Sequence, residues 1–182
     1  MAGADGNFHH AHLGRPSWVS GDIFTRSAQL GHLHAGEPWE FTRHILFEFQ
    51  NSDIDEEHPE WMVSWFAGVS ILRTIGHVLR NVDRKRSDET RIIVDDFWSD
   101  VQDNRITHWI FFDFIQRERN NILKEFSFGA SLPENSDDRR ILVYDTHDDW
   151  DGTQLFREAV YWWRAQLEHI DREIGKISTS TI

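Results

Sequence analysis

The segment at residues 107–126, THWIFFDFIQRERNNILKEF, combines an apolar helical pattern with polar groups that packing alone does not require. Its first half is apolar, and its second half becomes basic and amide-rich at Arg117, Arg119, Asn120, Asn121 and Lys124. A helix that is buried on one side and carries such groups in mid-span needs partners for them, because an unpaired buried polar group is costly. We therefore expect a polar groove here.

Arg119 and Asn120, with Lys124 five residues after the arginine, resemble the signature of HEPN-type helical bundles. In active members of that superfamily an Arg, commonly followed by Asn, acts with a His a few residues later in metal-independent RNA cleavage, usually across a dimer interface. The resemblance covers residues 59–126 and implies a four- or five-helix bundle. In this chain Lys124 stands where the histidine is expected, and the next histidine downstream is His147.

The missing histidine bears on catalysis, because an imidazole exchanges a proton near neutral pH whereas an ordinary lysine stays a cation. The resemblance therefore implies a non-catalytic or degenerate interaction module that binds RNA, a nucleotide or a protein partner, with Arg119, Asn120 and Lys124 as its site residues. The enzyme alternative is a metal-independent, toxin-like ribonuclease that uses Arg119 with a substitute acid–base group.

Ordinary helix-surface chemistry also accounts for these charges. Arg117 is spaced to pair with Asp113, and Lys124 is spaced to meet Asn120 or Asn121 along one helix. The Arg-Asn dipeptide also occurs at residues 80–81, so it is not specific by itself. On this interpretation the basic run is a solvated helix face.

A second candidate site is the acidic segment at residues 147–158, HDDWDGTQLFRE. Aligned with an EF-hand calcium loop, it places oxygen ligands and the turn glycine at the third, fifth, sixth and twelfth positions, Asp149, Asp151, Gly152 and Glu158. The first position holds His147 in place of aspartate, and the eighth, normally apolar, holds a glutamine. A structural helical protein with a calcium-binding loop is thus a further alternative; otherwise Asp149 or Asp151 caps the following helix.

Histidines are numerous, but they are not grouped with carboxylate or thiol ligands. His9, His10 and His12 could chelate a metal, but no carboxylate or cysteine partner is fixed nearby, which favours a solvated, histidine-rich terminus. The remaining helical histidines are isolated and predict structural roles, since the chain has no pair of Glu-x-x-His motifs for a di-metal site: His44, His77, His108 and His169. We expect no metal and no cofactor.

Composition indicates a folded acidic protein. The 182 residues carry a formal net charge of −12 with a pI near 5.3, which argues against a broad basic surface but leaves room for a local one. The absence of cysteine excludes disulfides, zinc–thiolate sites and thiol nucleophiles. We see no signal-peptide pattern and no apolar stretch approaching the roughly 18 residues of a transmembrane helix. A cytoplasmic protein without membrane contact is expected.

Hydrophobic periodicity predicts a mainly α fold, an antiparallel bundle of four or five helices. The expected helices cover residues 38–50, 59–83, 87–101, 107–126 and 153–176. Asp103 and Asn104 either break or merely kink the chain, so the third and fourth helices could be continuous. A short β excursion near residues 127–146 should pair residues 141–144 with residues 126–130.

We predict a single helical domain at residues 37–176, between an irregular N-terminal arm at residues 1–36 and a frayed tail at residues 177–182. Tryptophan is more abundant than one small core needs. Some of these rings are therefore expected in a homodimer seam, where tryptophan is favoured. The candidates are Trp61, Trp65, Trp98, Trp109, Trp162 and Trp163.

Overall fold

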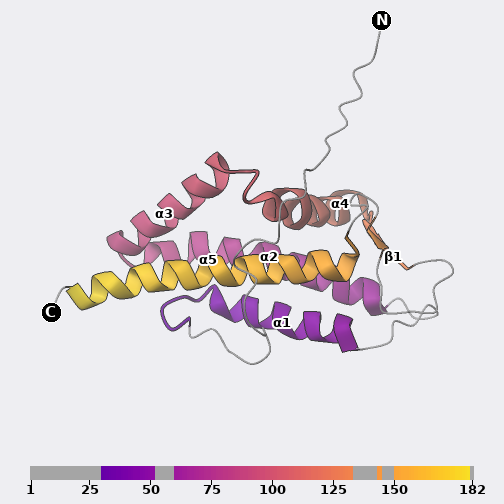
Figure 1. Ribbon diagram of the computed structural model, residues 1–182, viewed down its shortest axis with the longest axis horizontal. Coiled ribbons are helices and arrows are strands. Elements are labelled where there is room, and N and C mark those ends of the chain that lie inside the picture. Colours follow the sequence, from indigo (N-terminus) through magenta and orange to yellow (C-terminus); the bar gives the residue numbers. More distant parts are fainter. Residues whose placement is uncertain (1–29, 52–59, 133–142, 145–149, 181–182) are drawn as a thin grey trace, which may run out of the picture.

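A computed structural model describes residues 30–51, 60–132, 143–144 and 150–180 (Figure 1). Within these ranges the chain is mainly helical and carries one small antiparallel sheet. The elements in chain order are α1 (Gly36–Asn51), α2 (Glu60–Asn81), the 3-10 helix η1 (Asp83–Lys85), α3 (Asp88–Asp103), the π-helix η2 (Ile110–Gln116), α4 (Arg117–Glu125), β1 (Ala130–Ser131), β2 (Val143–Tyr144) and α5 (Gly152–Ser180). The predicted mainly α bundle with a short β excursion is confirmed.

Helices α2 and α5 run through the middle of the molecule, with α1 on one side and α3 and α4 on the other (Figure 1). α2 contacts α1, α4 and α5, while α5 also contacts α1, α3 and η2. The apolar stripes predicted along α2 and α5 are the surfaces that make these contacts, as expected for amphipathic helices in a bundle.

The centre of the bundle is built from tryptophans with at most 1% of their surface exposed: Trp39, Trp65, Trp162 and Trp163. Trp98 is also buried, at 8% exposure. The ring of Trp163 meets those of Trp98 and Trp162 edge-to-face, a geometry that aromatic side chains prefer. The core therefore accounts for four of the six tryptophans named as candidates for a dimer seam, and the burial of these four leaves the other two as candidates. Trp61 and Trp109 are partly exposed.

Two glycines let α2 approach its neighbours closely. A methyl group built at Gly68 would lie 2.5 Å from the ring of Phe156, and one at Gly76 would lie 3.0 Å from both Trp98 and Trp163. Such distances are shorter than carbon–carbon contacts in packed proteins. The large rings of α3 and α5 thus fill the space that side chains on α2 would occupy.

The start and end of α3 follow the sequence signals. The N–H of Thr90 donates to Oγ of Ser87 at 3.1 Å, so Ser87 caps the helix, a role that serine favours. The helix ends at Asp103, and residues 104–108 form a turn. A break at Asp103 and Asn104 is confirmed, and the alternative of one continuous helix is wrong.

Beyond the turn, the chain forms a π-helix where we expected an α-helix. Five of its seven residues are buried: Ile110, Phe111, Phe112, Phe114 and Ile115. The π turn is wider than an α turn and sets successive side chains at different angles, and here the run is packed against α2 and α5. Further along, Ile122 in α4 is 3% exposed, whereas Phe126 is 78% exposed because it leaves the helix in a left-handed conformation.

Strands β1 and β2 pair antiparallel, with Ala130 opposite Tyr144 and Ser131 opposite Val143. This confirms pairing between two parts of the predicted excursion. The pairing starts at the last residue of the segment 126–130 that we expected to supply one arm. Residues 141–142 of the expected strand lie outside the described residues.

The chain just before α1 packs against the bundle. Leu33 and Ala35 are buried. The carboxylate of Asp83 accepts the N–H groups of His34, at 2.8 Å, and Ala35, at 2.9 Å. Residues 30–36 thus belong to the packed structure, although we assigned them to an irregular arm. His9, His10 and His12 lie outside the described residues.

Length and composition alone make the helical stretch Glu60–Lys85 able to cross a membrane, since it contains an 18-residue window with a mean hydropathy of 1.3. The expectation that no apolar stretch approaches this length was wrong. The core helix of a soluble protein passes the same test. Seven α2 residues are buried in this bundle, Trp65, Gly68, Val69, Leu72, Ile75, Gly76 and Leu79.

Candidate functional site

Helix α4 carries the three residues that the sequence singled out. Arg119 and Asn120 are half-buried, and Nη1 of Arg119 donates to Oδ1 of Asn120 at 2.9 Å. Lys124 is exposed in the last turn. Among the described residues, no contact joins Lys124 to Asn120 or Asn121. The structure therefore brings together the arginine and the first asparagine only.

The expected ion pair between Arg117 and Asp113 is also absent from the described part of the chain. Asp113 lies within the π-helix and Arg117 begins α4. The prediction assumed α-helical spacing between the two residues, and the π-helix does not provide it. Arg117 is exposed to solvent.

An arginine of α2 joins the site, and sequence reasoning missed it. Arg73 is half-buried, and its pKa is lowered by burial, by the charge of Arg119 and by the charge of Arg80. An arginine nevertheless stays a cation at neutral pH. We call Arg73, Arg80 and Arg119 the arginine cluster. One sequence signal pointed to it, because Arg73 is the first charged residue after Glu60 in an otherwise apolar helix.

The cluster lies on aromatic rings of α3 and η2. The guanidinium carbon of Arg73 is 5.6 Å from the ring centre of Phe111, and that of Arg80 is 5.9 Å from Trp98. The rings of Trp98 and Phe111 are themselves 5.4 Å apart. Contacts of this kind hold an arginine without neutralising it, so the positive charge remains available to a ligand.

Within the described residues, no member of the cluster forms an ion pair with a carboxylate. Arginines elsewhere in the bundle do: Arg84–Asp95 at 2.6 Å, Arg164–Glu168 at 2.8 Å, Arg43–Glu40 at 3.1 Å and Arg91–Asp88 at 3.3 Å. The chain has 31 acidic residues and 19 basic ones. Arg73, Arg80 and Arg119 are not neutralised by an ion pair among the described residues, although the charge of Arg80 helps to lower the pKa of Asp95, and they form a candidate site for an anion.

Glu118 determines which way Arg119 faces. Its carboxylate is fully buried. Oε1 accepts the indole N–H of Trp65 at 2.8 Å and the backbone N–H of Gly129 at 3.0 Å, and Oε2 accepts the hydroxyl of Tyr144 at 3.0 Å. Successive helical residues differ by about 100° in direction, so fixing Glu118 inside turns Arg119 toward the edge of the bundle. The interpretation of this charged run as a solvated helix face is therefore wrong for Glu118.

A chain of hydrogen bonds connects α3, the turn before η2 and α5. The indole N–H of Trp162 donates to Nδ1 of His108 at 3.2 Å, which leaves Nε2 as the protonated nitrogen, 3.0 Å from Oδ2 of Asp100. Both ring nitrogens have partners, so His108 is a structural histidine, as expected. Hydrogen bonds from His108 and Asn104 lower the pKa of Asp100.

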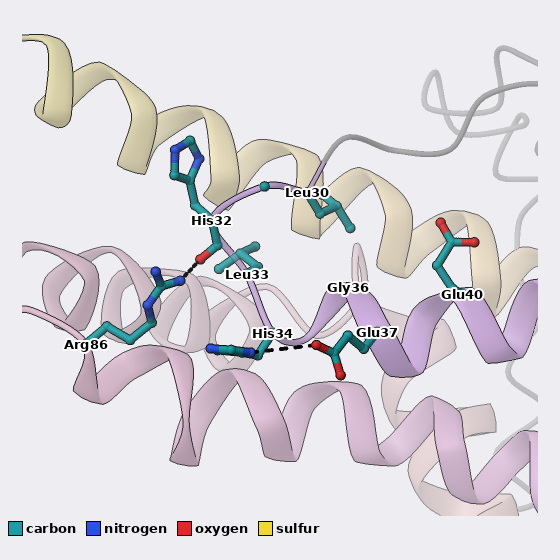
Figure 2. Close-up of a pocket in the computed structure, with 9 residues that line it drawn as sticks. Leu30, His32, Leu33, His34, Gly36, Glu37, Glu40 and Arg86 are labelled. Carbon is teal, nitrogen blue, oxygen red and sulfur yellow. Dashed lines mark hydrogen bonds and ion pairs between the residues drawn. The ribbon is translucent and has the colours of Figure 1, made fainter.

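An open cavity of about 390 Å³ lies at the N-terminal end of α1 (Figure 2). Its charged side chains already have partners. Arg86 donates to the carbonyl oxygen of His32, and Nδ1 of His34 lies 3.9 Å from Glu37 (Figure 2). Glu40 lies 3.1 Å from Arg43. The bond from Arg86 joins residues 30–36 to the bundle. Because its charged side chains have partners, the cavity offers a ligand fewer unpaired charges than the arginine cluster does.

The described part of the proposed calcium loop is helical, because α5 begins at Gly152. Oδ1 of Asp151 accepts the N–H of Gln154 at 2.7 Å, which confirms that this aspartate caps the helix. Glu158 is buried at 3% exposure within the helix. His147 and Asp149 lie outside the described residues. In the part of the chain that the structure describes, no three His, Asp or Glu side chains are grouped to hold a metal.

Comparison with protein-family models, with curated proteins and with solved structures finds no match for this chain. The function must therefore be argued from the arginine cluster, its aromatic support and Asn120.

Proposed function

We propose that the protein is a non-catalytic, HEPN-like module that binds phosphate groups of RNA or of a nucleotide through Arg73, Arg80 and Arg119. The observation that supports this proposal most strongly is that none of these three arginines forms an ion pair with a carboxylate among the described residues of a chain with a net charge of −12. The planar guanidinium group matches the geometry of phosphate and can form two parallel hydrogen bonds with it.

The support beneath the cluster favours binding as well. Arg73 and Arg119 are half-buried, and the aromatic contacts of Arg73 and Arg80 restrict their side chains before any ligand arrives. Arginines that are already held in place lose less conformational entropy when they bind. The side chain of Asn120 accepts a hydrogen bond from Arg119 and adds an amide group beside this arginine.

Binding accounts for this site better than RNA cleavage does. General acid–base catalysis requires a proton carrier within hydrogen-bond reach of the reacting atoms. Among the described residues, the side-chain hydrogen-bond partner of Arg119 is Asn120, and neither an imidazole nor a carboxylate contacts it. Lys124 is exposed and apart from the pair. We therefore expect a labelled RNA to stay intact in EDTA, and cleavage that disappears in Arg119→Ala would favour the ribonuclease instead.

The proposal is tested by the binding of a fluorescein-labelled 12-nucleotide RNA, followed by fluorescence anisotropy at several salt concentrations. We expect Arg73→Gln and Arg119→Gln each to weaken binding roughly tenfold, because each removes a charged contact to phosphate. Each should also reduce the slope of log K against log salt by about one unit, since one fewer counterion is released.

Arg172→Gln is the matched control, because it removes one exposed arginine from α5 and leaves the cluster intact. It should bind like the wild type apart from a small uniform loss. Equal weakening by all three substitutions would show that only total charge matters and would contradict a defined site. The expected homodimer and cytoplasmic location remain predictions.

A further inference from the structure

Phe126, at the end of α4, is in a conformation that a phenylalanine rarely adopts. Its φ is 51° and its ψ is 36°, in the left-handed region. Its N–H bonds to the carbonyl oxygen of Ile122, and the N–H of Ser127 bonds to that of Asn121, which completes a helix-ending motif. Glycine is the usual residue at this position, because the left-handed region is unfavourable for side chains with a Cβ.

Burial does not explain why a phenylalanine occupies this position, because 78% of its surface is exposed. The ring contacts Phe128 edge-to-face, with centroids 5.4 Å apart. Phe128 is itself partly buried against the core. The ring of Phe126 is therefore exposed to solvent, while its partner Phe128 is held against the core. An unfavourable backbone conformation that displays an exposed ring is a reason to look for a ligand.

The exposed ring lies on the helix that carries the phosphate-binding candidate. Arg119, Leu123 and Phe126 follow one another at i, i+4 and i+7, so about 10 Å of helix separates the first from the last. Leu123 is 49% exposed and continues the apolar surface between them. An unneutralised cation and an exposed aromatic ring thus lie within the length of two nucleotides.

We infer that Phe126, supported by Phe128, is a stacking surface for an unpaired nucleobase, and that the ligand of the arginine cluster is a single-stranded nucleic acid. This inference rests on the proposed phosphate-binding function and specifies its ligand. Positively charged residues that bind the backbone, together with aromatic rings that stack on bases, are the combination that recognises single strands. A base inside a duplex has no free face for the ring.

The experiment compares three labelled 12-nucleotide probes by fluorescence anisotropy: oligo(rA), an abasic strand of the same length, and an RNA duplex. The wild type should bind oligo(rA) roughly fivefold or more tightly than the abasic strand, because one stacked base contributes at least that much. Binding to the duplex should resemble binding to the abasic strand. Equal affinity for all three probes would overturn the stacking site.

Phe126→Gly separates a binding role from a structural one. It should remove the preference for oligo(rA) over the abasic strand while leaving the melting temperature unchanged or higher, because glycine suits the left-handed conformation. Phe126→Trp should retain the preference. Phe41→Ala is the matched control, since it removes another exposed ring, 63% accessible on α1, and should behave like the wild type.

The two proposals fail in different ways. If Arg73→Gln weakens binding to every probe while Phe126→Gly changes none, the phosphate site stands and the stacking surface is refuted. If the wild type binds none of the probes, the phosphate-binding function fails, and the stacking surface fails with it.

Discussion

Glu118 joins parts of the chain that are distant in sequence. Its carboxylate accepts hydrogen bonds from α2, from the backbone just before β1 and from the hydroxyl of β2. Among the described residues, no ion pair joins it to a cation, so three neutral donors alone compensate for its burial. Hydrogen bonds to a charged acceptor are stronger than those between neutral groups, and a donor left without an acceptor in the interior is costly.

Glu118→Ala should therefore lower the free energy of unfolding by about 3 kcal/mol, because it leaves three donors unmatched and opens a cavity. Glu118→Gln should lower it by only about 1 kcal/mol, since the amide oxygen replaces one acceptor and the amide group can donate to the hydroxyl of Tyr144. Urea unfolding measures both. Glu125→Gln, exposed on the same helix, is the control and should change little. Equal stability of all three variants would exclude the proposed role of Glu118.

The residues that could be predicted from the sequence are those whose partners are nearby in the chain. Ser87 caps α3 and Asp151 caps α5 through groups three residues away. The groups around Arg73 and Glu118 come from other elements of the fold. The helical run of charges therefore predicted a solvated face around Glu118, and the sequence analysis did not identify Arg73 as a site residue. Arg119 and Asn120 were identified by resemblance, but their arginine neighbours were not.

At the scale of elements, the connection between α3 and η2 depends on Asp100 and His108. Hydrogen bonds from His108 and from Asn104 lower the pKa of Asp100 in the folded protein. The unfolded chain then binds more protons than the native state near the ordinary aspartate pKa. This contribution to stability is fully present above the unfolded pKa and is lost as the pH falls through the lower folded value.

Asp100→Asn should remove that contribution. We expect the difference in unfolding free energy between wild type and variant to be under about 1 kcal/mol at pH 5, because the side chain is more than half exposed, and to shrink toward pH 3. Urea titrations at both pH values test this. Asp96→Asn, exposed on the same helix, should show no comparable change. If the difference in unfolding free energy between wild type and Asp100→Asn grew toward pH 3, the proposed contribution of Asp100 would be contradicted.

The helices could be predicted because their apolar residues recur every three or four positions, and that pattern is local. Helix α1 begins at Gly36 and α2 ends at Asn81, each within two residues of the predicted limit. The π-helix could not be predicted in the same way. Its apolar run fits a continuous α-helical pattern almost as well, and only the aromatic neighbours from α2, α3 and α5 favour turning five consecutive or nearly consecutive side chains inward.

For the molecule as a whole, stability depends on how closely α2 and α5 approach. Gly68 faces the ring of Phe156, which leaves no space for a methyl group. Gly68→Ala should lower the free energy of unfolding by about 1–3 kcal/mol, because overpacking outweighs the better helix propensity of alanine.

Gly175→Ala is the matched helical control, since a methyl group there would lie 3.9 Å from Cε1 of His32, an ordinary contact. It should raise the free energy of unfolding by up to about 1 kcal/mol. Thermal and urea unfolding of both variants give the comparison. If Gly68→Ala also raised the free energy of unfolding, α2 and α5 would have to lie farther apart at Gly68 than these distances indicate.

The π-helix has a consequence for evolution and for the comparison of related chains. A π turn accommodates one more residue than the α turn that it replaces. A relative that lacked one residue between positions 110 and 116 could form an uninterrupted α-helix there while α4 kept its orientation, so the residue aligned with Glu118 would still face the core. The π-helix thus accommodates an additional residue without moving the arginine site, and aligning such chains requires a gap inside the aromatic run.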